Sequence, residues 1–315
     1  MKNITKTIQK LAFDLLETNQ VKQVIGFTSS SILMSSKPIL ISSKDQAKRL
    51  VFNSHCSLNL ANYLRNLKEK TAVIAKGCDT RNIITHIVEN QIDKENLYII
   101  GVPCTGMIDK VKITSLFDDD IIGFSENKNT LIVKSKSKEQ KINKKNFMQE
   151  NCTLCTHKNP VIYDVMAGEP VKENILENPY PDVDKIQSMD TNARWEYFVN
   201  LTKNCIRCYA CKNACPLCYC PTCFVDESNP QWVGKGQNST DVATFHFLRA
   251  FHCAGRCTDC GACVAACPMN INVRDFTRKL NKDCFDLFNW EAGLNVSSRP
   301  PLDVYKPNDP DDFIK

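Results

Sequence analysis

The sequence predicts an α/β domain with a largely parallel sheet, followed by a small α-helical domain. In the first half of the chain, short apolar runs alternate with stretches of helical periodicity, which is the pattern of a parallel sheet. In the second half, helical stretches flank two groups of closely spaced cysteines. We expect an α/β domain over residues 1–158, a linker over 159–190, a helical domain over 191–292 and an irregular tail over 293–315.

Length and composition restrict the class of protein. The 315 residues are enough for two domains with their own cores, and 43% hydrophobic residues exclude a disordered or fibrous chain. The 18 cysteines are crowded rather than spread, which favours metal binding over a disulfide scaffold. The net charge of +5 counts cysteines as neutral, and each thiolate-bound iron–sulfur cluster would add about −2. We therefore expect no nucleic-acid partner.

The sequence also bears on location. Charged residues interrupt the apolar stretch within residues 1–20, so we expect no signal peptide and a cytoplasmic protein. No run approaches the ~18 apolar residues that a membrane-spanning helix requires. The chain is therefore not expected to span a membrane, although peripheral association stays open.

The elements of the α/β domain follow in order. An amphipathic helix is expected over 3–18, because Ile4, Ile8, Leu11 and Leu15 recur at helical spacing. The expected strands are 21–28, 38–42, 71–76 and 97–103, and the expected helices are 56–69 and 79–91. Lysines flank a short strand-like run at 130–133. A solvent-exposed hairpin is the favoured interpretation of this region, and a docking patch for an acidic electron carrier is the alternative.

The second half of the chain has a different composition. Residues 160–190 are rich in Pro, Asn, Asp and Glu, which predicts an extended linker over the surface. Helices are expected at 191–204, 240–251 and 273–288, and a proline-containing tail follows them.

Two cysteine runs share the spacing Cys-x2-Cys-x2-Cys-x3-Cys-Pro, which is typical of bacterial ferredoxins. In such runs three cysteines bind one [4Fe–4S] cluster and the fourth binds the other cluster. We assign one cluster to Cys205, Cys208, Cys211 and Cys267, and the other to Cys257, Cys260, Cys263 and Cys215. Neither cluster has an obvious open position for a substrate, so this domain is expected to transfer electrons.

An insertion between the two runs carries additional cysteines. They are Cys218, Cys220, Cys223 and Cys253. Four more ligands suggest a third metal site, and a third iron–sulfur cluster is favoured over zinc because the spacing matches no standard zinc pattern. Ordinary buried cysteines are the remaining interpretation.

A further group of cysteines lies in the α/β domain. Cys78 and Cys104 each follow an apolar strand, and the carboxyl ends of parallel strands line the ligand crevice of an open sheet. With the pair Cys152 and Cys155 they would complete a fourth site with four thiolates. Cys56 is either a reserve ligand or a core residue.

A candidate anion site overlaps this group. Gly77, Asp79, Thr80 and Arg81 lie where an expected strand turns into a helix. Asp79 can cap the helix, and the free N–H groups together with Arg81 could bind a flavin phosphate. On local evidence alone, a capped helix with a solvent-facing arginine is the favoured interpretation. No Gly-x-Gly-x-x-Gly run follows a strand, so FAD is a candidate cofactor without its usual fingerprint, and no catalytic residue is assigned.

These segments resemble a known family. Residues 75–81, 99–104, 151–155 and 163–168 are similar to the β-subunit family of coenzyme F-420-linked hydrogenases and formate dehydrogenases, over roughly residues 20–175. The resemblance implies an α/β domain that passes electrons between iron–sulfur clusters and a flavin, with the deazaflavin coenzyme F-420 as redox partner in some members.

The helical part has a resemblance of its own. Residues 248–252 and 255–261 are similar to the helical ferredoxin module of heterodisulfide reductases, in its C-type form, and the likeness extends over about 200–290. The cysteine-rich insertion departs from that module, since it has no place in a simple two-cluster protein.

Two functions are compatible with these features. The favoured one is an electron-transfer subunit that works with other redox subunits in a formate dehydrogenase, hydrogenase or heterodisulfide-reductase-like complex and relays electrons through several [4Fe–4S] clusters. The alternative is an FAD-dependent oxidoreductase that itself exchanges hydride with coenzyme F-420 or NAD(P) and passes electrons to the clusters. Bound flavin would distinguish them, because clusters alone do not accept hydride. Whether the chain is itself an enzyme stays open at this point.

Overall fold

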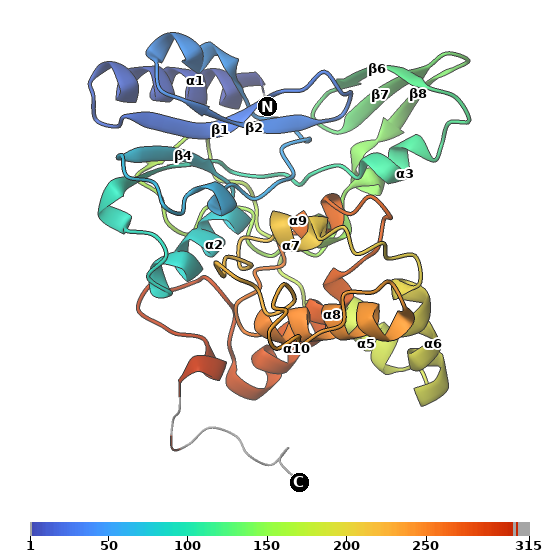
Figure 1. The fold of residues 1–315 in the computed structure, drawn as a ribbon. Coiled ribbons are helices and arrows are strands. Elements are labelled where there is room, and N and C mark those ends of the chain that lie inside the picture. Colours follow the sequence, from blue (N-terminus) through green and yellow to red (C-terminus); the bar gives the residue numbers. More distant parts are fainter. Residues whose placement is uncertain (1, 305–306, 308–315) are drawn as a thin grey trace.

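A parallel sheet and a cysteine-rich helical region lie on opposite sides of one helix. The computed structural model describes residues 2–304 and residue 307. Helix α1 covers one face of the sheet, α2 lies on the other face, and the helical region follows beyond α2 (Figure 1). The predicted fold class, α/β with a mostly parallel sheet plus a helical region, is confirmed.

The main sheet has the strand order β2-β1-β4-β5-β9, and β3 also pairs with β1. Its strands are β1 (Gln23–Ser29), β2 (Ser36–Ile41), β3 (Leu50–Val51), β4 (Thr71–Ala75), β5 (Leu97–Gly101) and β9 (Val165–Met166). β1, β4, β5 and β9 are parallel, whereas β2 and β3 run antiparallel to β1. All five residues of β4 are buried. A strand covered on both faces needs a continuous apolar sequence, which is what the chain has there.

The helices of the α/β part are α1 (Lys2–Glu17), α2 (Gly77–Val88), α3 (Lys110–Thr114) and α4 (Glu150–Thr153). Ile8, Ala12 and Leu15 form the buried stripe of α1. α2 begins directly after β4, and the Asp79 carboxylate accepts the backbone N–H of Lys76 at 2.9 Å. α2 differs from an ordinary surface helix because the residues from Asp79 to His86 are all buried.

A second, smaller sheet replaces the expected hairpin. It is antiparallel, in the order β6-β7-β8, and consists of β6 (Ile121–Glu126), β7 (Thr130–Ser135) and β8 (Glu139–Asn143). Leu131 and Val133 of β7 pack with Ile113 and Phe117 in a separate hydrophobic cluster. The predicted strand at 130–133 is therefore the central strand of a sheet with its own core.

Between residues 159 and 304, the structure contains six α-helices. They are α5 (Pro181–Gln187), α6 (Thr191–Thr202), α7 (Ala210–Ala214), α8 (Ser239–His252), α9 (Ala262–Ala265) and α10 (Arg274–Phe288). α6, α8 and α10 match the predicted helices within a few residues. α7 and α9 are single turns that contain the third cysteine of each ferredoxin-type run.

Short 3-10 helices connect these elements. They are η1 (Lys44–Arg49), η2 (Leu60–Tyr63), η3 (Lys94–Asn96), η4 (Lys144–Phe147) and η5 (Pro301–Asp303). The predicted helix at 56–69 is wrong, because only η2 forms there. Asn59 caps η2 by accepting from the Ala61 N–H and also donates to the Cys78 carbonyl, while Asn66 adopts a positive φ of 61° that stops helical propagation.

The segment expected as a linker contains regular structure. β9 adds a parallel strand to β5, with Val165 paired to Ile100 and Met166 to Gly101. Helix α5 follows later in the same segment. Sequence composition did not reveal β9, because two residues are too short for a periodicity signal.

Two further observations concern membrane-spanning helices and the C-terminal tail. Within residues 2–304, no helix is both long and apolar enough to cross a membrane. The predicted irregular tail begins with residues 293–304, which contain only η5. Its remaining part, residues 305–306 and 308–315, lies outside the described residues.

The core of the main sheet provides a test of the fold. Ile74 in β4 is buried, and a side chain added at Gly26 of β1 would meet its Cδ1 atom. We expect Ile74→Ala to lower the free energy of unfolding by about 2–5 kcal/mol, because it leaves a cavity in a packed interior. Ile122→Ala, at a half-exposed position of β6, should change it by about 0.5 kcal/mol or less. Urea unfolding of the anaerobic protein measures both, and equal losses would contradict this packing.

Candidate functional site

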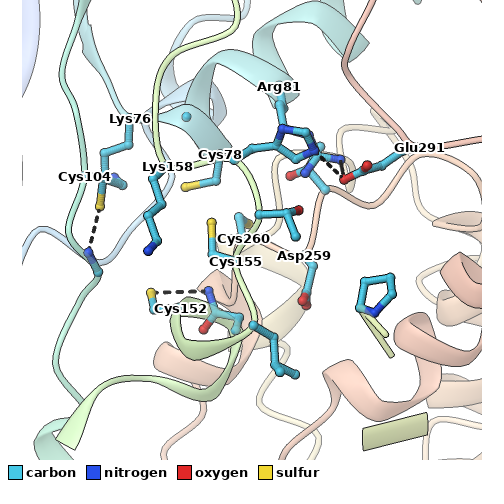
Figure 2. Close-up of a pocket in the computed structure, with 18 of the residues that line it drawn as sticks. Lys76, Cys78, Arg81, Cys104, Cys152, Cys155, Lys158, Asp259, Cys260 and Glu291 are labelled. Atoms are coloured by element: carbon cyan, nitrogen blue, oxygen red, sulfur yellow. Dashed lines mark hydrogen bonds and ion pairs between the residues drawn. The ribbon is translucent and has the colours of Figure 1, made fainter. Parts of the chain in front are cut away.

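Four cysteines of the α/β part meet in one cavity of about 250 Å³. They are Cys78, Cys104, Cys152 and Cys155, and Figure 2 shows their side chains around a common space. Cys78 lies in the first turn of α2 after β4, Cys104 follows β5, and Cys152 belongs to α4. The carboxyl ends of two adjacent parallel strands therefore deliver two of the four sulfur atoms.

Backbone N–H groups donate hydrogen bonds to two of these sulfur atoms, which stabilises negative charge on them. The N–H of Gly106 donates to Cys104 Sγ at 3.4 Å, and the N–H of Met107 donates to Cys152 Sγ at 3.3 Å. Hydrogen bonds to sulfur are among the features that set the reduction potential of iron–sulfur clusters. The donors thus fit cysteines that hold a cluster.

Burial keeps these cysteines protonated when no metal is bound. It raises the pKa of Cys152 to about 12 and that of Cys155 to about 11. The pKa values of Cys78 and Cys104 are raised as well, mainly by burial. Metals bind the thiolate form, so a cluster would replace the thiol protons with a compensating positive charge.

A buried lysine lies beside the four cysteines. Lys76 is 2% exposed, donates to the Leu58 carbonyl at 3.0 Å and pairs with Asp79 at 2.9 Å. Burial lowers the pKa of Lys76, but the Asp79 carboxylate outweighs this effect, so the pKa lies above its usual value. The ammonium group is therefore charged, and it favours an anionic group in the cavity.

The size of the cavity suits a compact group. Sites that enclose organic ligands commonly measure about 300–1,000 Å³. A cavity of about 250 Å³ with four sulfur atoms fits an iron–sulfur cluster better than a dinucleotide.

The second ferredoxin-type run reaches the same cavity. Asp259 and Cys260 line it together with the cysteines of the α/β part (Figure 2). Cys260 also lines a neighbouring cavity, whose cysteines include the predicted second set: Cys215, Cys257, Cys260 and Cys263. A side chain at Gly261, which has a φ of +73°, would collide with Asn151 of α4. Glycine thus lets the two cysteine groups approach each other.

The first ferredoxin set is supported by mutual proximity. Cys211 belongs to a hydrophobic cluster of the helical region, and Cys205 and Cys267 pack against the same cluster. Cys267 comes from the second run, so this proximity agrees with the exchange of fourth ligands that the spacing predicts. His246 Nε2 lies 3.2 Å from Cys205 Sγ, and Cys208 is exposed.

Buried ion pairs hold the second loop in place. Arg274 of α10 is 2% exposed and pairs with Asp259 at 2.8 Å, Glu150 at 3.1 Å and Asp182 at 3.4 Å. These partners come from the cysteine loop, α4 and α5. Removing one partner of such a buried network leaves an uncompensated charge. Arg274 therefore fixes the loop that contains Cys260 against the α/β part.

The residues predicted to bind a flavin phosphate have protein partners. A side chain at Gly77 would meet the carbonyl of His157, and Thr80 Oγ1 accepts the Val161 N–H at 3.0 Å. Arg81 donates to the Ala292 carbonyl at 2.9 Å and pairs with Glu291 at 2.9 Å. Asp79 pairs with Lys76, as described above. All four residues are buried, and their contacts favour a structural role over the expected phosphate site.

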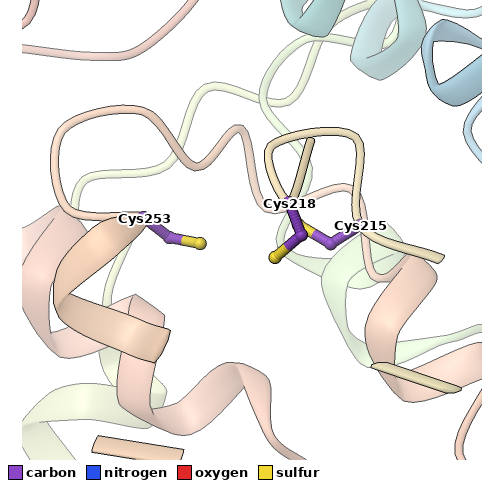
Figure 3. A group of neighbouring side chains, drawn as sticks. All are labelled: Cys215, Cys218 and Cys253. Carbon is purple, nitrogen blue, oxygen red and sulfur yellow. The ribbon is translucent and has the colours of Figure 1, made fainter. Parts of the chain in front are cut away.

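The insertion cysteines also come together. The Sγ atoms of Cys215, Cys218 and Cys253 lie within 4.8 Å of one another (Figure 3). Cys220 and Cys223 line the same cavity as Cys218 and Cys253. The sequence predicted the involvement of these residues but not the closeness of Cys215 to them.

Comparison with known proteins identifies relatives along nearly the whole chain. No family model matches it. The F420-dependent formate dehydrogenase subunit beta of Methanocaldococcus jannaschii is 24% identical over 362 residues, covering 91% of both chains. The F420-dependent formate dehydrogenase 1 subunit beta of Methanococcus maripaludis is 22% identical over 366 residues, covering 91% of this chain and 90% of the relative.

This chain is similar along most of its length to formate dehydrogenase beta subunits. The predicted resemblance is thereby confirmed, and the similarity to these beta subunits extends beyond the α/β part, since it covers 91% of the chain. A chain of the F420-reducing [NiFe] hydrogenase complex of Methanosarcina barkeri superposes on 50% of this chain and 63% of its own length, with a TM-score of 0.38 and 12% identity. That likeness is too weak to support an argument.

The four-cysteine cavity yields a direct test. Cys104→Ala should lower the content by up to about 4 iron atoms and about 4 sulfides per chain, because loss of one of four thiolate ligands destabilises a [4Fe–4S] cluster. Cys56 is buried in the core of the α/β part, its Sγ donates toward Asn53 Oδ1, and the residue does not line the cavity. Cys56→Ala is therefore the matched control and should retain full iron. Iron and acid-labile sulfide are measured in both variants after anaerobic purification. Unchanged iron in Cys104→Ala would contradict a cluster at the four-cysteine site.

Proposed function

We propose that this chain is the iron–sulfur electron-transfer subunit of a multisubunit formate dehydrogenase. One observation carries the proposal: Cys260, from the second ferredoxin-type run, lines the same cavity as the four cysteines at the end of the parallel sheet. Electron transfer slows steeply with distance, so neighbouring cluster sites form an efficient path. The curated relatives, named as subunits of F420-dependent formate dehydrogenases, support this assignment.

The residues of the chain have distinct tasks in this proposal. Bound [4Fe–4S] clusters supply one-electron chemistry. Cys205, Cys208, Cys211 and Cys267 would hold the first cluster, Cys257, Cys260, Cys263 and Cys215 the second, and Cys78, Cys104, Cys152 and Cys155 that of the α/β part. Lys76 compensates the charge of the last site, and Arg274 fixes the loop between the second site and the sheet. The partners are a formate-oxidising subunit and an acceptor, and the compartment is the cytoplasm.

A specific observation favours a second candidate function. The cavity continues from the cysteines past Lys158 and Arg278 to the aromatic side chains of Tyr180 and Phe285. Cations and aromatic walls suit an anionic, planar carrier. In this alternative, bound FAD exchanges hydride with coenzyme F-420 or NAD(P) and passes single electrons to the clusters.

The relay is tested in the anaerobically purified complex that contains this chain. We expect Cys260→Ala to lower formate-driven reduction of coenzyme F-420 by on the order of tenfold or more, because the path is interrupted. Formate-driven reduction of methyl viologen, which can accept electrons directly from the formate-oxidising subunit, should be retained. Cys284→Ala, at a buried cysteine outside the cluster sites, is the control.

The outcomes separate the candidates. The electron-relay proposal would be contradicted if the complex lacked a formate-oxidising subunit. It would also be contradicted if Cys260→Ala left the rate of formate-driven coenzyme F-420 reduction unchanged. Stoichiometric FAD, together with oxidation of reduced coenzyme F-420 by the isolated chain, would replace the relay with the oxidoreductase alternative.

A further inference from the structure

A separate cavity lies within the insertion between the two ferredoxin-type runs. All four insertion cysteines line it: Cys218, Cys220, Cys223 and Cys253. Its volume is about 280 Å³. None of these cysteines belongs to either ferredoxin set, so their common location needs an explanation of its own.

The boundary between this cavity and the second ferredoxin site is defined by the cysteines themselves. Cys215, Cys218 and Cys253 approach one another at this boundary (Figure 3). Cys215 lines the cavity of the second ferredoxin set, Cys218 lines the insertion cavity, and Cys253 lines both. Cys215 therefore remains available to the second set, as its spacing predicts, and the insertion keeps four cysteines.

A buried arginine is oriented toward both cavities. Arg249 of α8 is 5% exposed, lines the two cavities and donates one guanidinium N–H to the Cys211 carbonyl at 3.1 Å. Its Nε is buried and has no hydrogen-bond partner among the residues that the structure describes. An unsatisfied buried donor is costly, and one on a cation is more so. An anionic acceptor in the cavity would remove this cost.

Other groups on the wall agree with an anion. Arg256 and Lys212 lie on the wall, Lys212 in an ion pair with Asp226, while Leu217, Phe224 and Phe245 make the rest of the wall apolar. Arg256 is held by a charged hydrogen bond to Glu89 at 2.7 Å, which fixes it at the edge of the cavity. A thiolate-bound iron–sulfur cluster carries about two negative charges and needs such a setting.

The spacing of the sulfur atoms favours a cluster over a single metal ion. A zinc ion draws four sulfurs to about 2.3 Å from one point. Within the described part of the chain, the group of close ligand atoms contains Cys218 and Cys253 but not Cys220 or Cys223. The four insertion sulfurs thus line one cavity without being gathered around a single point.

We propose that Cys218, Cys220, Cys223 and Cys253 bind a further [4Fe–4S] cluster, with Arg249 between it and the second ferredoxin site. This cluster lies beside the predicted relay rather than within the two ferredoxin sets. Cys220 is exposed, so this site is close to solvent. The proposal does not depend on the identity of the formate-oxidising partner or of the carrier.

The test compares the metal content of the full-length chain after anaerobic purification. The double substitution Cys220→Ala and Cys223→Ala should remove about 4 iron atoms and about 4 sulfides per chain. Electron paramagnetic resonance spectra of the reduced protein should keep the ferredoxin signals and lose one further signal. Cys284→Ala should match the wild type in both measurements.

Other outcomes overturn the proposal. Unchanged iron and sulfide would mean that these cysteines bind no cluster, and the loss of about one zinc with iron unchanged would mean a zinc site. If the double variant loses all clusters, the iron content of the single variant Cys220→Ala is measured instead, because this exposed side chain is dispensable for packing. Retention of full iron in that single variant would end the proposal.

Arg249 provides an independent readout. Arg249→Gln removes a positive charge between two cluster sites, so reduction of both clusters should require a more negative potential. A redox titration followed by electron paramagnetic resonance measures this shift. Potentials equal to those of the wild type would show that Arg249 does not face the clusters. Neither the metal content nor the redox titration depends on formate turnover. A failure of this cluster proposal can therefore be told apart from a failure of the proposed function.

Discussion

The burial of α2 between the parallel sheet and the cysteine-rich region is the constraint on which the cysteine arrangement depends. Asn82 donates to Thr258 Oγ1 at 2.7 Å, His86 Nε2 lies 2.8 Å from the Pro216 carbonyl, and Arg81 donates to Ala292. A helix with polar side chains on its outer face would ordinarily meet water. Here those side chains hold the ferredoxin-type runs and the segment after α10, and Cys78 at the start of the same helix consequently lies beside Cys260.

Buried positive charge accompanies the cysteine groups of both halves. Lys76 lies beside the four cysteines of the α/β part, Arg249 borders the second ferredoxin site and the insertion, and Arg274 anchors the loop of Cys260. A buried cation is costly unless anionic groups surround it. Carboxylates pair with Lys76 and Arg274, whereas Arg249 Nε has no hydrogen-bond partner among the described residues, and a thiolate-bound cluster beside it would supply negative charge.

The local features of this protein were predictable, whereas the contacts between distant segments were not. Alternating apolar runs revealed β1, β4 and β5, and cysteine spacing revealed the ferredoxin-type runs, because both signals repeat over short stretches. β9 and η2 were not predicted. β9 is only two residues long, and η2 depends on the contact of Asn59 with α2. The proximity of Cys260 to Cys78 has no sequence signal, because it arises when Asn151 packs on Gly261. Likewise, the partners of Arg81 in the segment 291–292 could only be seen in the fold.

The central claim is that the cluster of the α/β part and the second ferredoxin cluster are neighbours in one electron path. The most direct measurement is electron paramagnetic resonance of the fully reduced chain, which detects magnetic coupling between adjacent paramagnetic clusters. We predict a spectrum broadened and split by spin–spin interaction, which simplifies to isolated signals when the four-cysteine site of the α/β part is removed. A spectrum of the intact chain that is the plain sum of uncoupled clusters would contradict the account.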